Sequence, residues 1–418
     1  MVLNYIWIGF FLVGLLVALM RSMLEPAQPV MHDVVIAVFE ISEGAVMNVA
    51  LPLMGIIIFW MGMMRIGEKG GAVQLIGRGI APFLSKIFKG VPKDHPAHGS
   101  IVMNFSANML GLDNAATPMG LKAMEQLQEL NPKKDTASDA QIMFLVLNTS
   151  GLTLIPTSII GYQVAYKAAD PTDVFLPILI ATACSSLFGL LVVSLIQRIN
   201  LLRPAIILTL LGVSGLIAGL IGLITSLPEY QMEATSQTIS ATFILGFIAF
   251  FLILGFRKKL NLYEEFVEGA KEGIQVTLRI IPYLVAMLAS IAVFRASGAL
   301  DYVLDGITWV VHGFSSETRF VDALPVALMK PLSGSGARAL MIDTWGAVND
   351  AGAAVNIDTF KGKLAAVFQG STETTFYVLA VYFGSINIRN TRYAAGAGLL
   401  ADLAGIIAAI IVAYAFFG

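Results

Sequence analysis

The residues best suited to bind a polar ligand stand in two short segments that interrupt otherwise apolar sequence. Segment 108–117 carries amide, hydroxyl and carboxylate side chains, and segment 333–338 combines serines and glycines with Arg338. Glycine allows a backbone to approach a ligand closely, and an arginine supplies several donors for a carboxylate or phosphate. These two segments therefore predict the binding of a small polar solute.

Two further polar segments resemble each other. LNTSGLTLIPTSIIG at 147–161 aligns with FQGSTETTFYVLAVYFG at 368–384 and places Asn148 over Gln369, Ser150 over Ser371 and Thr153 over Thr374. Glu373 stands in the second of them, and an acid inside an apolar span is expected to act in ion coupling, proton carriage or solute contact.

Taken together, these segments predict one solute site. Its candidate residues are Asn108, Asp113, Asn114, Thr117, Asn148, Thr149, Ser150, Thr153, Ser333, Ser335, Arg338, Gln369, Ser371, Glu373 and Thr374. The structural alternatives stay open: helix caps for the residues of segment 108–117, hydroxyl bonds to the residue's own helix for segment 148–153, and an ion pair of Arg338 with Asp343 or Glu373.

Composition places these segments in a membrane protein. Hydrophobic residues make up 57% of the 418 residues and charged residues 13%, against about 25% charged in a soluble domain. The lipid bilayer is then a partner, and without a long basic run nucleic acid is not expected. The sequence lacks HExxH, P-loop and GxSxG motifs, so we expect no enzyme, no catalytic residues, no cofactor and no metal site.

The apolar segments predict nine membrane crossings with the N-terminus cytoplasmic and the C-terminus external. The basic segment 65–94 sets this orientation. The orientation holds only if the interrupted segments 99–126 and 320–347 are re-entrant hairpins. The expected spans are 3–21, 47–64, 139–166, 173–197, 204–226, 237–256, 279–296, 360–387 and 393–416.

The two halves follow the same order of segments, which predicts an internal repeat. Each half has a span, an amphipathic helix (31–45 and 261–275), a proline-containing span, a second amphipathic helix, a hairpin, an interrupted span and a final span. The extra span near 204–226 would invert the second repeat. We therefore expect an all-α polytopic protein of two inverted-topology repeats, divided into 1–200, a linker helix at 201–232, and 233–418.

The motif residues resemble a known family. Segment 108–124 is similar to spore maturation protein A, and segments 330–338 and 370–378 are similar to spore maturation protein B, which are both of the nucleoside recognition, or Gate domain, group. The resemblance implies a fusion of two usually separate proteins and an integral transporter of the bacterial inner membrane. Asp113 departs from the small residue expected at its position.

The leading hypothesis is secondary transport of a small polar solute, zwitterionic or nucleoside-like, with a coupling ion and a homo-oligomer left open. The alternatives are a Gate-type permease for an ion or metal ion, and a membrane subunit for assembly or signalling that transports nothing. The sequence does not separate these three.

Overall fold

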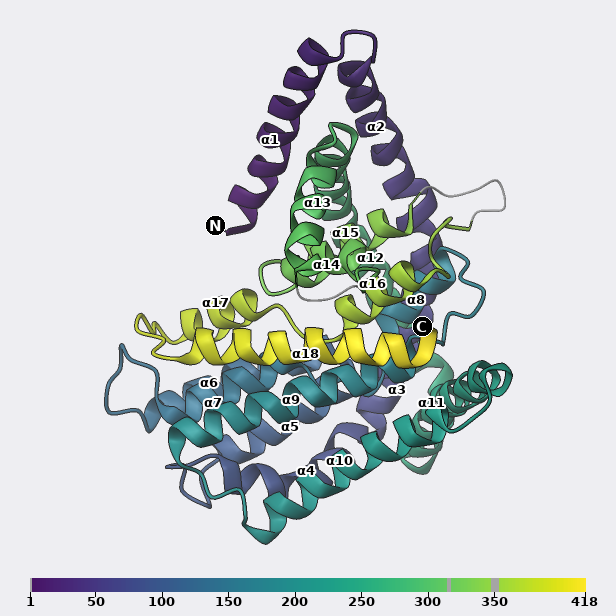
Figure 1. The fold of residues 1–418 in the computed structure, drawn as a ribbon. Helices are drawn as coiled ribbons and strands as arrows, with labels where there is room; N and C mark the ends of the chain where they lie inside the picture. Colours follow the sequence, from purple (N-terminus) through teal and green to yellow (C-terminus); the bar gives the residue numbers. More distant parts are fainter. Residues whose placement is uncertain (1, 314–316, 347–352) are drawn as a thin grey trace. The chain divides into compact units, whose positions relative to one another are not determined.

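The computed structural model describes residues 2–313, 317–346 and 353–418, and every regular element in those ranges is a helix (Figure 1). The side chains of residues 2, 3, 48, 49, 113–115, 205, 224, 225, 229, 230, 232, 233 and 279 lie outside the description. The all-helical prediction is confirmed for the described residues.

The helices succeed one another in the same order in the two halves. The first half contains α1 (Val2–Leu24), α2 (Val30–Gly44), a π-helical segment (Ala45–Ala50), α3 (Leu51–Gly70), α4 (Ala72–Ile87), α5 (Ala97–Met109), α6 (Asp113–Glu129), α7 (Asp139–Ser150), α8 (Thr157–Ala165) and α9 (Phe175–Gln197). After α10 (Pro204–Thr225), the second half contains α11 (Glu229–Arg257), α12 (Leu262–Ala296), α13 (Ala299–His312), a 3₁₀ turn (Val321–Ala323), α14 (Leu324–Met329), α15 (Gly334–Trp345), α16 (Phe360–Gly370), α17 (Thr375–Ser385) and α18 (Ala394–Phe417).

Within the described ranges, seven helices are long and apolar enough to cross a membrane. They account for seven of the nine expected spans, and the chain is a multi-pass membrane protein. The other two expected spans are the interrupted pairs α7–α8 and α16–α17. Large apolar side chains remain exposed on α1, α10 and α11, among them Leu16, Leu208 and Leu245, as expected for surfaces that face lipid.

The first interrupted span has a defined start and stop. Ser138 caps α7 by accepting from the Gln141 amide, while the Gln141 side chain accepts from the Ser138 amide, so two amides at the helix start are satisfied. Gly151 ends α7 with a φ of 58°, a left-handed conformation that glycine adopts at little cost.

Both amphipathic helices differ from expectation because they are continuous with the spans that follow. The first runs through the π-helical segment into α3, and the second forms the first part of α12. Neither junction contains a residue with positive φ, and Pro52, the second residue of α3, follows the π-helical segment without ending the helix. Pro282 lies inside α12 and does not end it.

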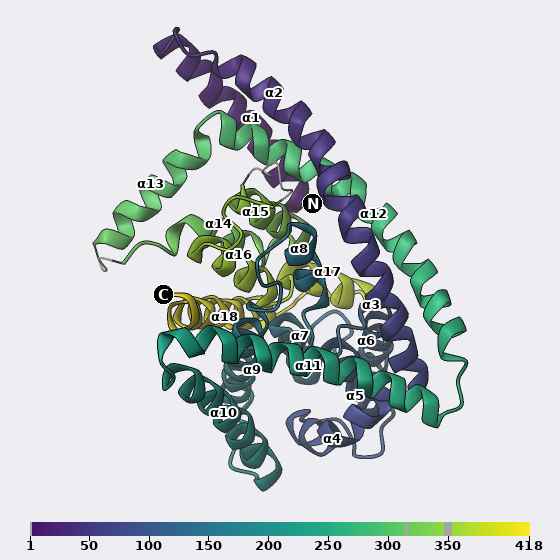
Figure 2. The same ribbon diagram turned by 90° about the vertical axis from the view of Figure 1, so that its right-hand side faces the viewer.

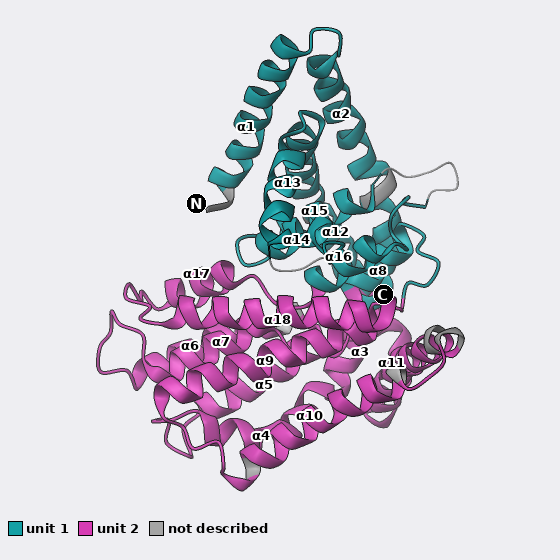
Figure 3. Ribbon diagram, viewed as in Figure 1, with its two compact units in different colours: residues 1–60, 158–171, 270–369 teal, residues 61–157, 172–269, 370–418 magenta. Residues whose placement is uncertain are grey.

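The chain forms two compact units, each drawn from both halves (Figure 3). Unit 1 contains residues 1–60, 158–171 and 270–369, and unit 2 contains 61–157, 172–269 and 370–418. Unit 2 thus combines the hairpin α5–α6 with α7 and α17, whereas unit 1 combines the hairpin α14–α15 with α16 and nearly all of α8. Each unit takes one hairpin, the first half of one interrupted span and the second half of the other.

Unit 2 has its core where α18 lies along α9 and α7 (Figure 1). Residues 142–146 of α7 are completely buried there, and α10 and α11 lie beside α9 (Figure 2). In unit 1, α1 packs against α2 and α13. The Trp7 indole donates to the Ala286 carbonyl at 2.9 Å, and Arg21 donates to the Ser297 carbonyl at 3.1 Å.

Candidate functional site

The end of the first hairpin is tied to the break in the first interrupted span. The turn between α5 and α6 contains Gly111 at a φ of 70°. The Asn108 amide group donates to Asn148 Oδ1 at 2.8 Å, and the Leu154 amide donates to the Met109 carbonyl at 2.8 Å. The hairpin end and the break at 151–156 therefore satisfy each other's polar groups.

The second break, at residues 371–374, meets the first one inside unit 2. The Glu373 amide donates to the Thr149 carbonyl at 2.8 Å. A Cβ atom built on Gly151 would lie 2.9 Å from Glu373 Cγ, so only a glycine permits this approach without displacement. The two breaks, from different halves of the chain, thus meet at Thr149, Gly151 and Glu373.

Several hydroxyls of the first break form bonds within their own segment. Thr149 donates to Val146 O at 2.9 Å, Ser150 to Leu147 O at 3.0 Å, and Thr153 to Gly151 O at 2.9 Å. This is the structural alternative considered for these residues. Their hydroxyl hydrogens are engaged, while their oxygen lone pairs can still accept.

The second hairpin places its polar residues at the start of α15, in unit 1. Ser333 is the N-cap, and its hydroxyl accepts from the Gly336 amide at 3.0 Å and lies 3.2 Å from the Ser335 hydroxyl. The Gln369 side chain, from α16, donates to the Gly334 carbonyl at 3.3 Å. The second hairpin and the second interrupted span therefore meet in unit 1 at a helix N-terminus, which favours negative charge.

Arg338 lies one turn into α15 with donors to spare. Its guanidinium carbon is 5.4 Å from the ring centroid of Tyr162, a cation–π distance. Arg338 Nε and Gln369 Oε1 are buried without a hydrogen-bond partner. The suggested pairing of Arg338 with Asp343 is wrong, because Asp343 pairs with Arg295 at 3.0 Å. Arg338 forms no ion pair within the described residues.

The remaining candidates are placed as follows. Ser371 and Thr374 are buried, Thr117 is half-buried in α6, and the Glu373 side chain is exposed on the protein surface. The side chains of Asp113 and Asn114 lie outside the described part of the structure, although their backbone begins α6. The candidates thus form two clusters: the unit 2 cluster (Asn108, Asn148, Thr149, Gly151, Glu373) and the unit 1 cluster (Ser333, Ser335, Arg338, Gln369, Tyr162).

The sequence reasoning missed two polar residues in the spans. Asp402 stands in the middle of α18, is 1% exposed and accepts a hydrogen bond from Thr375 at 2.6 Å. An acid within an apolar helix of this length is itself a signal that could have singled it out. Tyr162 could not be found this way, because its contact with Arg338 joins residues from opposite halves of the chain.

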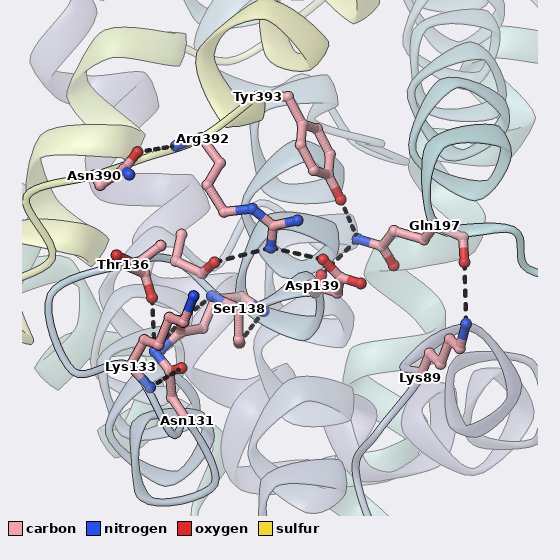
Figure 4. Close-up of polar contacts among 12 residues, drawn as sticks. Lys89, Asn131, Lys133, Thr136, Ser138, Asp139, Gln197, Asn390, Arg392 and Tyr393 are labelled. Carbon is pink, nitrogen blue, oxygen red and sulfur yellow. Dashed lines mark hydrogen bonds and ion pairs between the residues drawn. The ribbon is translucent and has the colours of Figure 1, made fainter.

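A polar network closes one end of unit 2 (Figure 4). Arg392 reaches Asp139 at 2.7 Å and the Ala137 carbonyl at 3.1 Å, and Gln197 donates to the Tyr393 hydroxyl and the Asp139 carbonyl. Lys89 donates to the Gln197 carbonyl at 3.3 Å. These bonds join the start of α7, the end of α9 and the start of α18.

Within the described residues, no group of three or more His, Cys, Asp or Glu side chains is arranged to hold a metal ion. The oxygen-rich clusters described above consist mainly of amides and hydroxyls.

A match to a family profile shows which protein family the chain belongs to. The profile described as Gate, nucleoside recognition, matches residues 50–164 and 277–389, which together exceed half of the chain. The chain belongs to the Gate family. Each matched stretch of this Gate protein spans one hairpin and one interrupted span, so the family pattern occurs twice, as the internal repeat predicted.

Two relatives from Bacillus subtilis (strain 168) are similar to parts of this Gate protein. Spore maturation protein A is 40% identical over 189 residues, covering 45% of this chain and 92% of that protein. Spore maturation protein B is 45% identical over 180 residues, covering 43% of this chain and 96% of that protein. These matches confirm the resemblance and are consistent with a fusion. No solved structure gives a significant match.

Proposed function

We propose that this Gate protein is a secondary transporter of the bacterial inner membrane that carries a small polar solute with an anionic group. The single observation that carries the proposal is the unit 1 cluster. In this cluster, Arg338 Nε and Gln369 Oε1 are buried without a hydrogen-bond partner. Arg338 lies near the N-terminus of α15 in the second hairpin, and Gln369 lies at the end of α16, where the second interrupted span breaks. Broken helices with polar ends inside a membrane protein are a transporter design.

The unit 1 cluster favours a carboxylate or phosphate group on the solute. Arg338 is held against Tyr162 rather than by an acid, so its fixed charge can be met by a ligand. Gln369 Oε1 can accept from a donor on the same ligand. Because the cluster offers both a positive charge and a side-chain oxygen that can accept from a donor, we propose an amino-acid-like or nucleoside-like compound. The family description, nucleoside recognition, supports the same class.

The test compares a carboxylate ligand with its amide analogue. We expect the purified wild-type protein to prefer the carboxylate, and Arg338→Gln to lose that preference about 10-fold or more, since a charge-assisted hydrogen bond contributes about 1.5–3 kcal/mol. Arg319→Gln, which changes an exposed arginine of the same unit, should leave the preference unchanged. Retention of the preference in Arg338→Gln contradicts the proposal.

Uptake in proteoliposomes separates the three functional classes. Accumulation of the solute supports the transporter. Flux of a divalent cation without solute supports the ion or metal-ion permease, and absence of any flux supports the assembly or signalling subunit.

The arrangement of the repeats is part of the same proposal. We propose inverted topology with re-entrant hairpins, a cytoplasmic N-terminus and an external C-terminus. In support of this, each unit contains the first half of one interrupted span and the second half of the other. A cysteine at Ala351 would report on the second repeat, but Ala351 lies outside the residues that the structure describes. Exposed Lys134 and Val355 are suitable instead, once Cys184 has been replaced. Single cysteines there should be labelled from the cytoplasmic and the external side respectively, and labelling of both from one side contradicts the inversion.

A further inference from the structure

The second amphipathic helix of each half begins in the same way but carries the opposite charge. Both α4 and α13 follow a glycine with positive φ, which is Gly71 in the first half and Gly298 in the second. The sequence of α4 contains Arg78 and Lys86 but no acid, whereas α13 contains two aspartates and no lysine or arginine. Equivalent helices with opposite charge are suited to different surroundings, and α4 favours an anionic partner.

The charges of α4 point away from the protein core. On its apolar side, Leu84 and Ile87 are buried in the core of unit 2 together with Ile206 of α10. Arg78 and Lys86 lie on the opposite side of the helix and are exposed. The apolar side of α4 is thus covered by protein, and its basic side remains open to a ligand.

The turn between α9 and α10 shows where this surface lies relative to a bilayer. Residues 175–197 and 206–223 of these two helices are long and apolar enough to cross a membrane. The turn between the helices carries Arg198 and Arg203, which are both exposed. A turn that joins two spans lies at the boundary between hydrocarbon and water, which is the level of the lipid headgroups.

The end of α4 is held at the same turn. Lys89, just beyond α4, donates from Nζ to the carbonyl of Gln197 at 3.3 Å, directly before Arg198 (Figure 4). In addition, α10 packs against α4. Two basic residues from the end of α4 and two from the turn therefore stand at one membrane boundary of unit 2. These four residues are called the interfacial basic group: Lys86, Lys89, Arg198 and Arg203.

Acids do not neutralise this group. Within the described residues, none of its four side chains forms an ion pair. Asp139, whose carbonyl accepts from Gln197, uses its carboxylate to pair with Arg392 at 2.7 Å. Asp94 follows Lys93 directly in the sequence, so these two charges balance each other. The interfacial basic group thus keeps its positive charge for an external anion.

Apolar surface continues from the interfacial basic group along the two spans. Leu195 on α9 is 68% exposed, and Leu208 on α10 is 69% exposed. Free phosphate or a nucleic acid could meet the charges but would leave these side chains uncovered. A phospholipid satisfies both surfaces, because its phosphate meets the basic residues while its acyl chains lie along the helices.

We propose that the interfacial basic group binds the headgroup of an anionic phospholipid. Clusters of lysine and arginine beside a span are attracted to such lipids, and basic pockets between spans can hold one headgroup. The orientation proposed above places the group on the cytoplasmic side, and α4 would then be held along that membrane surface. The binding uses no residue of the unit 1 cluster and does not rest on the proposed transport function.

The test measures lipid binding to the purified full-length protein in a non-ionic detergent, without any solute. Thermal unfolding is followed with dioleoyl phosphatidylglycerol, dioleoyl phosphatidylcholine or inorganic phosphate, at equal concentration and ionic strength. For the wild type we expect phosphatidylglycerol, at about 100 times its dissociation constant, to raise the melting temperature by about 3 °C over phosphatidylcholine. Lys89→Gln/Arg198→Gln should bind about 30-fold more weakly, since each basic residue near an anionic surface contributes about fivefold. The difference between the lipids should then fall to about 1 °C.

Two further variants make the result specific. Lys86→Gln/Arg203→Gln covers the case in which loss of the Lys89 hydrogen bond impairs folding, and it should reduce the difference between the lipids by a similar amount. Arg257→Gln/Lys259→Gln removes two exposed charges at the end of α11, another span of unit 2, and should leave the difference unchanged.

Three results would overturn the proposal. These are an equal response of the wild type to the two lipids, a response to inorganic phosphate as large as that to phosphatidylglycerol, and a loss in Arg257→Gln/Lys259→Gln as large as that in Lys89→Gln/Arg198→Gln. None of them changes the carboxylate preference expected from Arg338, so the two proposals fail separately.

Discussion

The ends of the two hairpins occupy equivalent places in the repeat but differ in how their polar groups are used. In unit 2, the hairpin end is closed by hydrogen bonds from Asn108 to Asn148 and from Leu154 to Met109. In unit 1, Arg338 Nε and Gln369 Oε1 are buried and have no such partner. The repeat thus contains one hairpin end whose polar groups pair with each other and one, the proposed ligand site, with buried polar atoms that have no hydrogen-bond partner.

This difference agrees with the chemistry of the residues involved. Two asparagines can satisfy each other with a neutral bond at low cost, while the charge of a buried arginine is balanced only by an anion. A substitution should therefore affect stability in unit 2 and ligand binding in unit 1. The following predictions use that contrast.

The largest expected effect on stability is that of Asn148→Leu. This change removes the acceptor of the 2.8 Å bond from Asn108 and the bond from Asn148 to the Phe144 carbonyl, also 2.8 Å. Leaving a buried donor unsatisfied costs about 1–3 kcal/mol. We expect a lower melting temperature for Asn148→Leu, and little or no change for Arg338→Gln, measured by thermal unfolding in the same detergent.

Equal destabilisation by both variants would remove the contrast between the hairpin ends. The double variant Asn108→Leu/Asn148→Leu sharpens it, because it should be more stable than the sum of the two single changes implies. A coupling near zero would mean that the bond between the two asparagines contributes nothing.

A smaller effect is expected from Gly151→Ala at the first break. The residue has a φ of 58°, and the added methyl would approach Glu373 Cγ to 2.9 Å. We expect a loss of about 1 kcal/mol or more in the free energy of unfolding. Gly215→Ala in α10, where nothing lies within 4 Å, should be neutral or slightly stabilising. A neutral Gly151→Ala would show that the two breaks do not need their close approach.

The smallest effect is expected from Asp139→Asn, which removes the ion pair with Arg392 at the closed end of unit 2. The pair is short, at 2.7 Å, but its side chains are 40% and 38% exposed. Solvent screening limits such pairs to about 0.2–1 kcal/mol. The expected shift in melting temperature should vanish in high salt, and a large, salt-independent loss would indicate that this network is more than a surface contact.

The fold was predictable to the extent that it depends on local sequence. Seven spans, both hairpins and the two interruptions follow from apolar length, glycine and polar residues, as at Gly151. The continuity of α2 with α3 was not predicted. An amphipathic helix and an apolar helix have the same helical periodicity, so the pattern alone does not show whether they form one helix or two.

The sequence predicted which types of residue belong to the candidate site, but much less which residues contact one another. The polar segments were expected to form one site, and the structure brings Thr149 and Gly151 of one of them to Glu373 of another. An ion pair of Arg338 with Asp343 or Glu373 was the structural alternative to solute binding, whereas Arg295 pairs with Asp343 and Arg338 contacts Tyr162. Such pairings join residues far apart in the sequence or choose between neighbours on one helix, and single-sequence patterns carry no information on either.

The interleaving of the units has a consequence for biosynthesis. The core of unit 2 joins Phe144 and its neighbours on α7 to Val378 on α17 and Ala401 on α18. The 225 positions from Ser150 to Thr375 must be translated before these helices can meet, which at ribosomal speed takes about 10–45 s. During that time the face of α7 that packs against α17 and α18 lacks these neighbours, so insertion into the membrane must precede the completion of tertiary structure.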